Sequence, residues 1–215
     1  LFWAATSTAA PAMATLTAVT NAPAAPLAGA FVVNSPLDTN DLDSVLTLRE
    51  AILVANGTLI GDFSPSEQAQ LSGCVFNGSG FIIGGCGAGI TDTISFSSSL
   101  VITLTSALPA ITDTRGTIIN ACYNAYPCAV IEAGGIAANT DALTVNGRDN
   151  QIWGLQIQRS PRDGIRVNGD ANALNYLKVY SSADNGVRLN GDNNRIYQGT
   201  IGFSTAGSGQ NCYPN

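Results

Sequence analysis

Between Asp141 and Gly207 the sequence repeats itself at an interval of 22 residues. Each repeat carries an Asn-Gly pair, a later Asn, and two apolar residues separated by one position. The pairs are Asn146-Gly147, Asn168-Gly169 and Asn190-Gly191, and the later residues are Asn150, Asn172 and Asn194. A fixed period of this length predicts a solenoid, in which each full turn, or rung, buries its apolar face only against its neighbours.

The apolar residues before each Asn-Gly pair alternate with polar ones, which is typical of a strand with one buried face. They are Leu143 and Val145, Ile165 and Val167, and Val187 and Leu189, and they flank Thr144, Arg166 and Arg188. A second strand is expected to hold Ile152 and Ile157, Leu174 and Val179, and Ile196 and Ile201. About three short strands then close one rung, and successive rungs lie about 4.8 Å apart.

Further short strands are predicted upstream, beginning with Phe31–Val33. Runs rich in β-branched residues and bounded by Ser, Pro, Asp or Gly occur at Thr93–Phe96, Val101–Leu104, Ala110–Thr112, Thr117–Ile119 and Ala129–Glu132. Their connections are too short for crossover helices, so parallel pairing requires a chain that coils and pairs each strand with one a full rung later. A flat β-sandwich is the competing architecture. The 22-residue register favours the coil, so the expected fold class is all-β, a parallel β-helix.

Asn150, Asn172 and Asn194 are expected to stack at the bend between two strands. Stacked amide side chains can hydrogen-bond along the column, as they do in other cross-β arrangements. A ligand-binding column is the alternative interpretation. We favour a structural ladder that stabilises the turn.

One helix is expected, starting after Thr47. Thr47 and Glu50 have the spacing of a capping box, in which each side chain bonds the other residue's backbone N–H. Apolar residues follow at helical spacing, and Asn56-Gly57 ends the helix; these residues are Leu48, Ala51, Ile52 and Ala55. So short a helix is not stable alone, and we expect it to dock on the first rung as an N-terminal cap.

Three stretches around this helix share a recognisable pattern: Phe31-Val32-Val33-Asn34-Ser35, Leu46-Thr47-Leu48-Arg49-Glu50-Ala51-Ile52 and Ala55-Asn56. They resemble the segment, named for a Cys-Ser-Leu-Arg-Glu-Ala motif, that opens exported bacterial right-handed parallel β-helix proteins. Leu46 stands where that motif has Cys, so any contact made by the Cys is absent here. The resemblance implies a right-handed, pectate-lyase-like solenoid and export, and it implies no particular activity.

Charge is scarce in this sequence. Asp, Glu, Lys and Arg make up 11% of the residues, the net charge is −6, and Lys178 is the only lysine. A nucleic-acid binder needs a basic patch, so we do not expect that partner. The sequence contains no histidine, which excludes His-dependent acid–base chemistry and His metal sites. We name no catalytic residue, no metal ligand and no cofactor.

Four of the five cysteines fall into two pairs that are close in sequence, and the fifth has no close neighbour of its kind. Cys74 and Cys86 are 12 positions apart, and Cys122 and Cys128 are 6 positions apart. This spacing predicts two disulfides formed in an oxidising compartment, with free buried thiols as the alternative. Cys212 is left over. We therefore expect a secreted or cell-surface protein.

The chain divides into three parts. Residues 1–30 carry no charge and are rich in Ala, Thr and Pro, which indicates the remainder of an export signal or a linker. Residues 31–60 form the cap segment, and residues 61–215 the β-helix, with a Cys-containing insertion near 61–92. No stretch is suited to a transmembrane span. Since the repeat stops in mid-pattern, we expect further rungs or domains after Asn215.

Arg166 and Arg188 would lie one rung apart on the same outward face, about 5 Å from each other. Like charges at that distance are unfavourable unless an anion lies between them. Two interpretations remain open. In one, Asp163, Asp170 and Asp192 supply the anions of a surface charge network. In the other, an acidic sugar chain is gripped by Arg162, Arg166 and Arg188, since Arg suits bidentate carboxylate contacts.

The carboxylates give only weak signs of catalysis. Asn139-Thr140-Asp141 resembles one motif of polygalacturonase-type glycosidases, but the accompanying Asp-Asp and Gly-His-Gly motifs are missing. Asp163 and Asp184 fall near adjacent rungs, as a glycosidase pair would, yet both stand in turn-forming contexts. The acidic turn from Asp38 to Asp43 lacks the Gly and the distal Glu of a calcium loop, so we expect a solvated turn.

These patterns favour an exported or cell-surface scaffold, non-catalytic, that serves adhesion or glycan contact. The alternative is a polysaccharide lyase or glycoside hydrolase that acts on an acidic polysaccharide. An enzyme is expected to hold carboxylates of shifted pKa, or a metal, in an outward groove. A scaffold is expected to show only turn-bound Asp and Asn. The expected partner is a polysaccharide or a cell-surface component.

Overall fold

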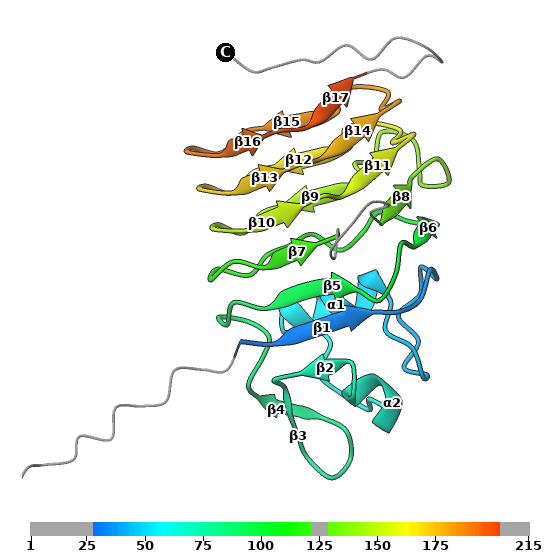
Figure 1. The fold of residues 1–215 in the computed structure, drawn as a ribbon, viewed down its shortest axis with the longest axis vertical. Helices are drawn as coiled ribbons and strands as arrows, with labels where there is room; N and C mark the ends of the chain where they lie inside the picture. The colour runs from blue at the N-terminus through cyan, green and yellow to red at the C-terminus, as the bar shows by residue number, and fades with distance from the viewer. Residues whose placement is uncertain (1–27, 122–128, 203–215) are drawn as a thin grey trace, which may run out of the picture.

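The computed structural model describes residues 28–121 and 129–202, in which the chain coils into stacked rungs along one long axis (Figure 1). Three sheets of parallel strands line the coil. The first has the order β16 (Arg195–Tyr197), β13 (Ala173–Asn175), β10 (Gln151–Trp153), β7 (Ile118–Asn120), β5 (Thr93–Phe96), β1 (Ala30–Val33) and β2 (Leu71–Ser72), of which β2 alone is antiparallel. The second is β17 (Thr200–Gly202), β14 (Lys178–Tyr180), β11 (Gln156–Gln158), β8 (Val130–Glu132) and β6 (Val101–Thr103). The third is β15 (Val187–Leu189), β12 (Ile165–Val167) and β9 (Leu143–Val145).

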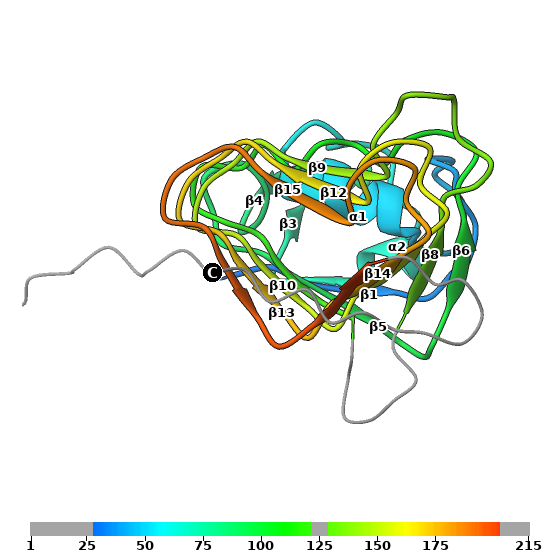
Figure 2. The same cartoon turned by 90° about the horizontal axis from the view of Figure 1, so that it is seen from above.

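The register of these strands confirms the 22-residue repeat. Leu174 pairs with both Ile152 and Ile196, and Ile165 pairs with Val187. Apolar side chains therefore stack on apolar side chains from rung to rung, and the inward columns are buried up to the last described rung, where Val187 and Ile196 are half-buried and Leu189 is exposed. Seen from above, the chain runs counterclockwise from β13 through β14 to β15 while it rises toward the viewer, so the coil is right-handed (Figure 2). The expected fold class is confirmed.

The structure differs from two of the strand predictions. The second strand of each repeat is two strands, because the chain bends at a left-handed residue such as Gly154, with φ 68°, between β10 and β11. The run Ala110–Thr112 makes only a single bridge, between Ile111 and Val145. Its other edge faces the side chain of Asn56, which donates to the Ala110 carbonyl at 2.8 Å and accepts from the Thr112 N–H at 2.8 Å.

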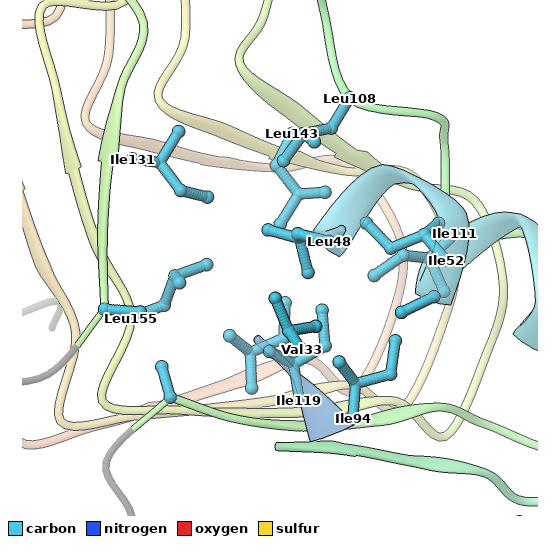
Figure 3. Close-up of a cluster of buried hydrophobic side chains, with 14 of the residues drawn as sticks. Val33, Leu48, Ile52, Ile94, Leu108, Ile111, Ile119, Ile131, Leu143 and Leu155 are labelled. Atoms are coloured by element: carbon cyan, nitrogen blue, oxygen red, sulfur yellow. The ribbon is translucent and has the colours of Figure 1, made fainter. Parts of the chain in front are cut away.

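The helix α1 (Leu48–Ala55) lies inside the coil at its N-terminal end (Figure 2). Its apolar residues Leu48 and Ile52 point into the interior, near Val33, Ile94 and Ile119 (Figure 3). The capping box forms as expected: the Glu50 N–H donates to Thr47 Oγ1 at 3.2 Å, and the Thr47 N–H donates to Glu50 Oε2 at 2.8 Å. The helix thus closes the first rungs and supplies part of their core.

The side chain of Asp38 helps to hold the cap segment in place. This corrects the expectation of a solvated turn. Its side chain is buried, and its Oδ1 accepts from Arg49 Nη2 at 2.7 Å. Its Oδ2 accepts from the Thr105 N–H at 2.7 Å. Arg49 also donates to the carbonyls of Ser106 and Ala107 at 3.0 Å. The Asp38–Arg49 pair therefore ties the cap segment to the loop that follows β6.

The insertion between α1 and β5 folds against the N-terminal end. It contains a second helix, α2 (Pro65–Gln68), which the sequence did not lead us to expect, and a hairpin of β3 (Val75–Phe76) and β4 (Ile82–Gly84). The disulfide Cys74–Cys86 closes the hairpin, as predicted. The other candidate pair, Cys122 and Cys128, lies outside the described residues. So do Cys212, most of the predicted signal or linker, and the end of the chain.

The asparagine column is confirmed as a hydrogen-bonded ladder. Asn150 Nδ2 donates to Asn172 Oδ1 at 2.9 Å, and Asn172 Nδ2 donates to Asn194 Oδ1 at 3.0 Å. A second, exposed ladder joins the Asn residues of the Asn-Gly pairs, with Asn168 Nδ2 donating to Asn146 Oδ1 at 2.8 Å. Within the described ranges, no helix has the length and apolarity needed to span a bilayer.

Candidate functional site

A hollow of about 530 Å³ lies on the outward face of the first sheet. We call it the aromatic groove. It crosses β10, β13 and β16, which belong to three successive rungs. Its lining consists of three aromatic residues, three amide side chains and one alanine: Trp153, Tyr176, Tyr197, Gln151, Asn175, Gln198 and Ala173.

Strand alternation positions most of these side chains. Ile152, Leu174 and Ile196 point into the core, so the residues on either side of each point outward. The register then builds two outward columns. One column is Gln151, Ala173 and Arg195, and the other is Trp153, Asn175 and Tyr197.

The corner after each strand contributes the third column of the groove. Gly154, Tyr176 and Gln198 occupy equivalent positions, and their φ angles are 68°, 55° and 43°. This left-handed backbone is costly for a residue with a side chain. It places the Tyr176 ring against Trp153, with the ring centroids 6.1 Å apart and the planes 28° from parallel. The indole Nε1 of Trp153 also donates to Gln151 Oε1 at 3.4 Å.

The three aromatic side chains are unusually exposed for their size. The exposed fraction is 38% for Trp153, 49% for Tyr176 and 50% for Tyr197. A cluster of exposed aromatic residues beside a hollow marks an interaction site more often than an isolated apolar residue does. Asn175, between Trp153 and Tyr197, is almost fully buried, and it forms the floor of the groove.

The lining of the groove carries no formal charge. Its aromatic faces offer flat apolar contact area, while tyrosine hydroxyls and amide groups both donate and accept hydrogen bonds. Apolar surface with a few convergent polar groups is the usual composition of a small-molecule site. The lining contains no carboxyl group, so the groove offers binding contacts and no general acid or base of that kind.

The structure places the predicted Arg162 and Arg166 in an ion-pair network with two buried carboxylates. Arg162 Nε donates to Asp141 Oδ1 at 2.5 Å. Arg166 Nε lies 2.8 Å from Asp141 Oδ2, and Arg166 Nη2 donates to Asp163 Oδ2 at 2.9 Å. Burial alone would raise the pKa of Asp141, but hydrogen bonds from Arg162 and the Asp163 N–H outweigh it and lower that pKa. The charge network is thus present, with Asp141 as its centre.

Arg188 pairs with Arg166 across β12 and β15, as the register predicted, and it is exposed. Asp170 and Asp192, proposed as partners, lie at another corner, where the Asp192 N–H donates to Asp170 Oδ1 at 2.8 Å. Within residues 28–121 and 129–202, Arg188 makes no ion pair. Binding of an acidic sugar by Arg162, Arg166 and Arg188 stays a prediction, although two of the three guanidinium groups already hold carboxylates.

The two carboxylates considered as a glycosidase pair, Asp163 and Asp184, lie in different surroundings. Asp163 is fully buried and stacks with Asn185, whose Nδ2 donates to Asp163 Oδ1 at 2.8 Å. Asp184 stands 22 residues after Arg162, so it lies one rung later in the column beside that of Asp163 and Asn185, and it is exposed. Asp141 from the Asn139-Thr140-Asp141 stretch is bound to Arg162 and Arg166. Ion pairs and hydrogen bonds within the coil thus engage the carboxylates of Asp141 and Asp163.

Two carboxyl groups have clearly raised pKa values, and both lie in the N-terminal part. Burial raises the pKa of Glu50 to about 7 and that of Asp92 to about 6, against the lowering effect of their hydrogen bonds. Neither lines the aromatic groove. In the part of the chain that the structure describes, no cluster of three or more Cys, Asp or Glu is arranged to hold a metal ion.

The groove was not predicted from the sequence, although one signal for it is present there. Trp153 and Tyr197 are 44 residues apart, which is two repeats, so both belong to one outward column. Tyr176 is 23 residues after Trp153, so it belongs to the neighbouring column. Only the bend at the corner brings its ring onto the indole.

Comparison of this chain with family models, with curated proteins and with solved structures found no match. The function proposed for the aromatic groove therefore follows from its residues and geometry alone.

Proposed function

We propose that this protein is an extracellular β-helix scaffold that binds a glycan through the aromatic groove. The observation that carries the proposal is the exposed stack of Trp153 on Tyr176, with Tyr197 on the same face two rungs later. The C–H faces of a sugar ring are flat and apolar, and they pack well on indole and phenol rings. The proposed role is contact or adhesion without catalysis.

The polar part of the groove also suits a sugar. Hydroxyl groups both donate and accept hydrogen bonds, so they are best satisfied by groups that do the same. The side chains of Gln151, Asn175 and Gln198 have this property. A nucleic acid would instead need cations along its backbone, and the lining has none.

Export is part of this proposal and has separate support. The disulfide Cys74–Cys86 closes the insertion hairpin. Structural disulfides persist in oxidising compartments and are rare in the cytosol. A glycan-binding surface outside the cell is consistent with that chemistry.

The proposal is tested by screening the purified protein against immobilised glycans and then titrating any ligand found. Trp153 is one of two tryptophans, so a Trp3→Phe background makes its indole fluorescence report on the groove. We expect Trp153→Ala to weaken binding by at least about fivefold, since one aromatic contact is worth on the order of 1 kcal/mol or more.

Tyr180→Ala is the matched control, because Tyr180 is an outward aromatic residue on β14, outside the groove. It should leave the affinity unchanged. Equal binding by wild type and Trp153→Ala, with both proteins folded by circular dichroism, would remove the groove from consideration. Binding to no glycan at all would contradict the proposed function.

A further inference from the structure

We infer that the ligand of the aromatic groove is a linear, uncharged glycan that lies along the stacking axis of the solenoid and spans three rungs. This inference rests on the proposed function, and it adds the ligand's charge, its shape and its orientation.

The direction follows from how the contact residues are distributed. Along a strand, each rung offers only three residues, for example Gln151 to Trp153, before the chain bends away at Gly154. Across the strands, Trp153 and Tyr197 stand in one column two rungs apart, which is about 10 Å at the usual strand spacing. A chain of sugar rings that lies across the strands can therefore contact both aromatic rings, and one that lies along a strand cannot.

The middle rung gives the groove its hollow. At the registers of Gln151 and Trp153, the next rung carries the smaller residues Ala173 and Asn175. The rung after that carries Arg195 and Tyr197, which are large again. Two small residues between two large pairs leave a space over the middle rung, and Tyr176 lines that space from the corner. The arrangement suits one ring seated over Asn175, with its neighbours on Trp153 and Tyr197.

The charge distribution favours an uncharged ligand. No Asp, Glu, Lys or Arg belongs to the lining, while Arg195 lies one rung beyond Ala173 in the same column. The chain as a whole carries a net charge of −6, which repels a polyanion at low ionic strength. The groove therefore differs from the sites of acidic polysaccharides, where cations meet each carboxylate.

The first experiment compares ligands by calorimetry and by Trp153 fluorescence in the Trp3→Phe background. The probes are β-1,4-linked gluco-, xylo- and chito-oligosaccharides of one to six units, coiled α-1,4-linked gluco-oligosaccharides, and acidic oligogalacturonides. We expect affinity for at least one extended neutral series to rise at least tenfold from one unit to three or four and then level off.

Three outcomes overturn the inference and leave the proposed function standing: a monosaccharide that binds as tightly as its trimer, a preference for the oligogalacturonides, or a preference for the coiled series. Failure of every saccharide to bind contradicts the proposed function itself. The two failures are therefore distinguishable.

The second experiment fills the middle rung. Ala173→Arg introduces the side chain that already stands at the same register one rung later, as Arg195, so the rung is expected to accommodate it. Because the new guanidinium lies one rung from that of Arg195, we expect the melting temperature to fall by a few degrees with the fold kept, and the affinity for the trimer to fall at least tenfold. Ala173→Ser is the matched control and should bind as wild type does.

Tyr197→Ala tests the length of the site. It should reduce the gain in affinity between short and long oligosaccharides, while affinity for the shortest ligand that binds stays within about twofold of wild type. If Ala173→Arg binds the trimer as wild type does, or if Tyr197→Ala weakens ligands of every length equally, the orientation along the stacking axis is wrong.

Discussion

Asn172 Oδ1 accepts two hydrogen bonds from Asn150 of the preceding rung, one from its side-chain Nδ2 at 2.9 Å and one from its backbone N–H at 2.8 Å. Asn172 in turn donates both bonds to Asn194 Oδ1, at 3.0 and 2.9 Å. Asn150 and Asn172 are both buried. The column therefore satisfies backbone groups that the bend would otherwise leave without partners.

Asn172→Ala should destabilise the protein by about 2–3 kcal/mol, because it leaves the buried N–H of Asn150 without an acceptor. The expected fall in melting temperature is about 4–12 °C for a chain of this size. Thermal melts followed by circular dichroism measure it. Asn168→Ala, in the exposed ladder, is the control and should cost less. An equal loss of stability in the two variants would show that the buried ladder stabilises the protein no more than the exposed one does.

The glycine of each Asn-Gly pair lets the backbone of one rung pass close to the next. A Cβ added at Gly169 would lie only 1.9 Å from the Gly147 carbonyl oxygen. We expect Gly169→Ala to lower stability by at least about 2 kcal/mol, because backbone must move to relieve the clash. Gly78→Ala is the control, since nothing lies within 4 Å of its added Cβ. Urea unfolding of both variants checks the difference.

Much of the fold could be predicted because its signals are local and repeated. The alternation around Thr144, Arg166 and Arg188 sets which residues face inward, and the 22-residue period sets which rungs pair. The capping box around Thr47 and Glu50 likewise depends on neighbours in sequence. Each of these patterns is a direct consequence of strand or helix geometry.

The features that escaped prediction depend on contacts between columns or between distant segments. Asp141 pairs with Arg162, 21 residues later, and Tyr176 stacks on Trp153, 23 residues earlier. These separations of 21 and 23 residues each differ by one from the 22-residue period. Such a contact joins two different columns at a corner, so an alignment of the repeats does not reveal it. Asp38 and Arg49 meet the loop after β6 only once the helix is seated inside the coil.

The buried Glu50 predicts a stability that depends on pH. Its Oε1 has no hydrogen-bond partner, and its neighbours Glu67 and Asp43 add negative charge. Burial raises its pKa from 4.5 to about 7, so ionisation opposes folding. This cost is absent below the unfolded pKa, near 4.5, grows as pH rises, and is complete above about pH 7.

Glu50→Gln should therefore stabilise the protein at pH 8 and change little near pH 4.5, since Gln also completes a capping box. Asp92, whose pKa burial raises to about 6, titrates in both proteins, so the difference between them isolates Glu50. Urea unfolding at several pH values measures it. A difference that stays constant from pH 4.5 to 8 would show that Glu50 is not the titrating group.

Asp141 predicts the opposite pH dependence. Its hydrogen bonds with Arg162 and the Asp163 N–H hold its pKa below the ordinary value, so it contributes stability above the unfolded pKa of about 3.9 that is lost as pH falls. Asp141→Asn should cost about 2 kcal/mol or more at pH 7 and less at pH 3. Asp149→Asn is the control, because its pair with Arg148 is exposed and should contribute little. Similar losses for both variants at pH 7 would contradict a special role for the buried carboxylate.

Tyr176 predicts a separation of stability from binding. Its φ of 55° is a left-handed backbone that Gly154 adopts at the same corner one rung earlier without a side chain. Tyr176→Gly should relieve about 1 kcal/mol of backbone strain and lose about 0.5–1.5 kcal/mol of stacking on Trp153. The melting temperature is therefore expected to change by only a few degrees, while glycan affinity falls at least as much as in Tyr176→Ala. Thermal melts and ligand titration on both variants measure the two effects. A large loss of stability in Tyr176→Gly would mean that the tyrosine is kept for folding, and unchanged affinity would mean that its ring does not contact the ligand.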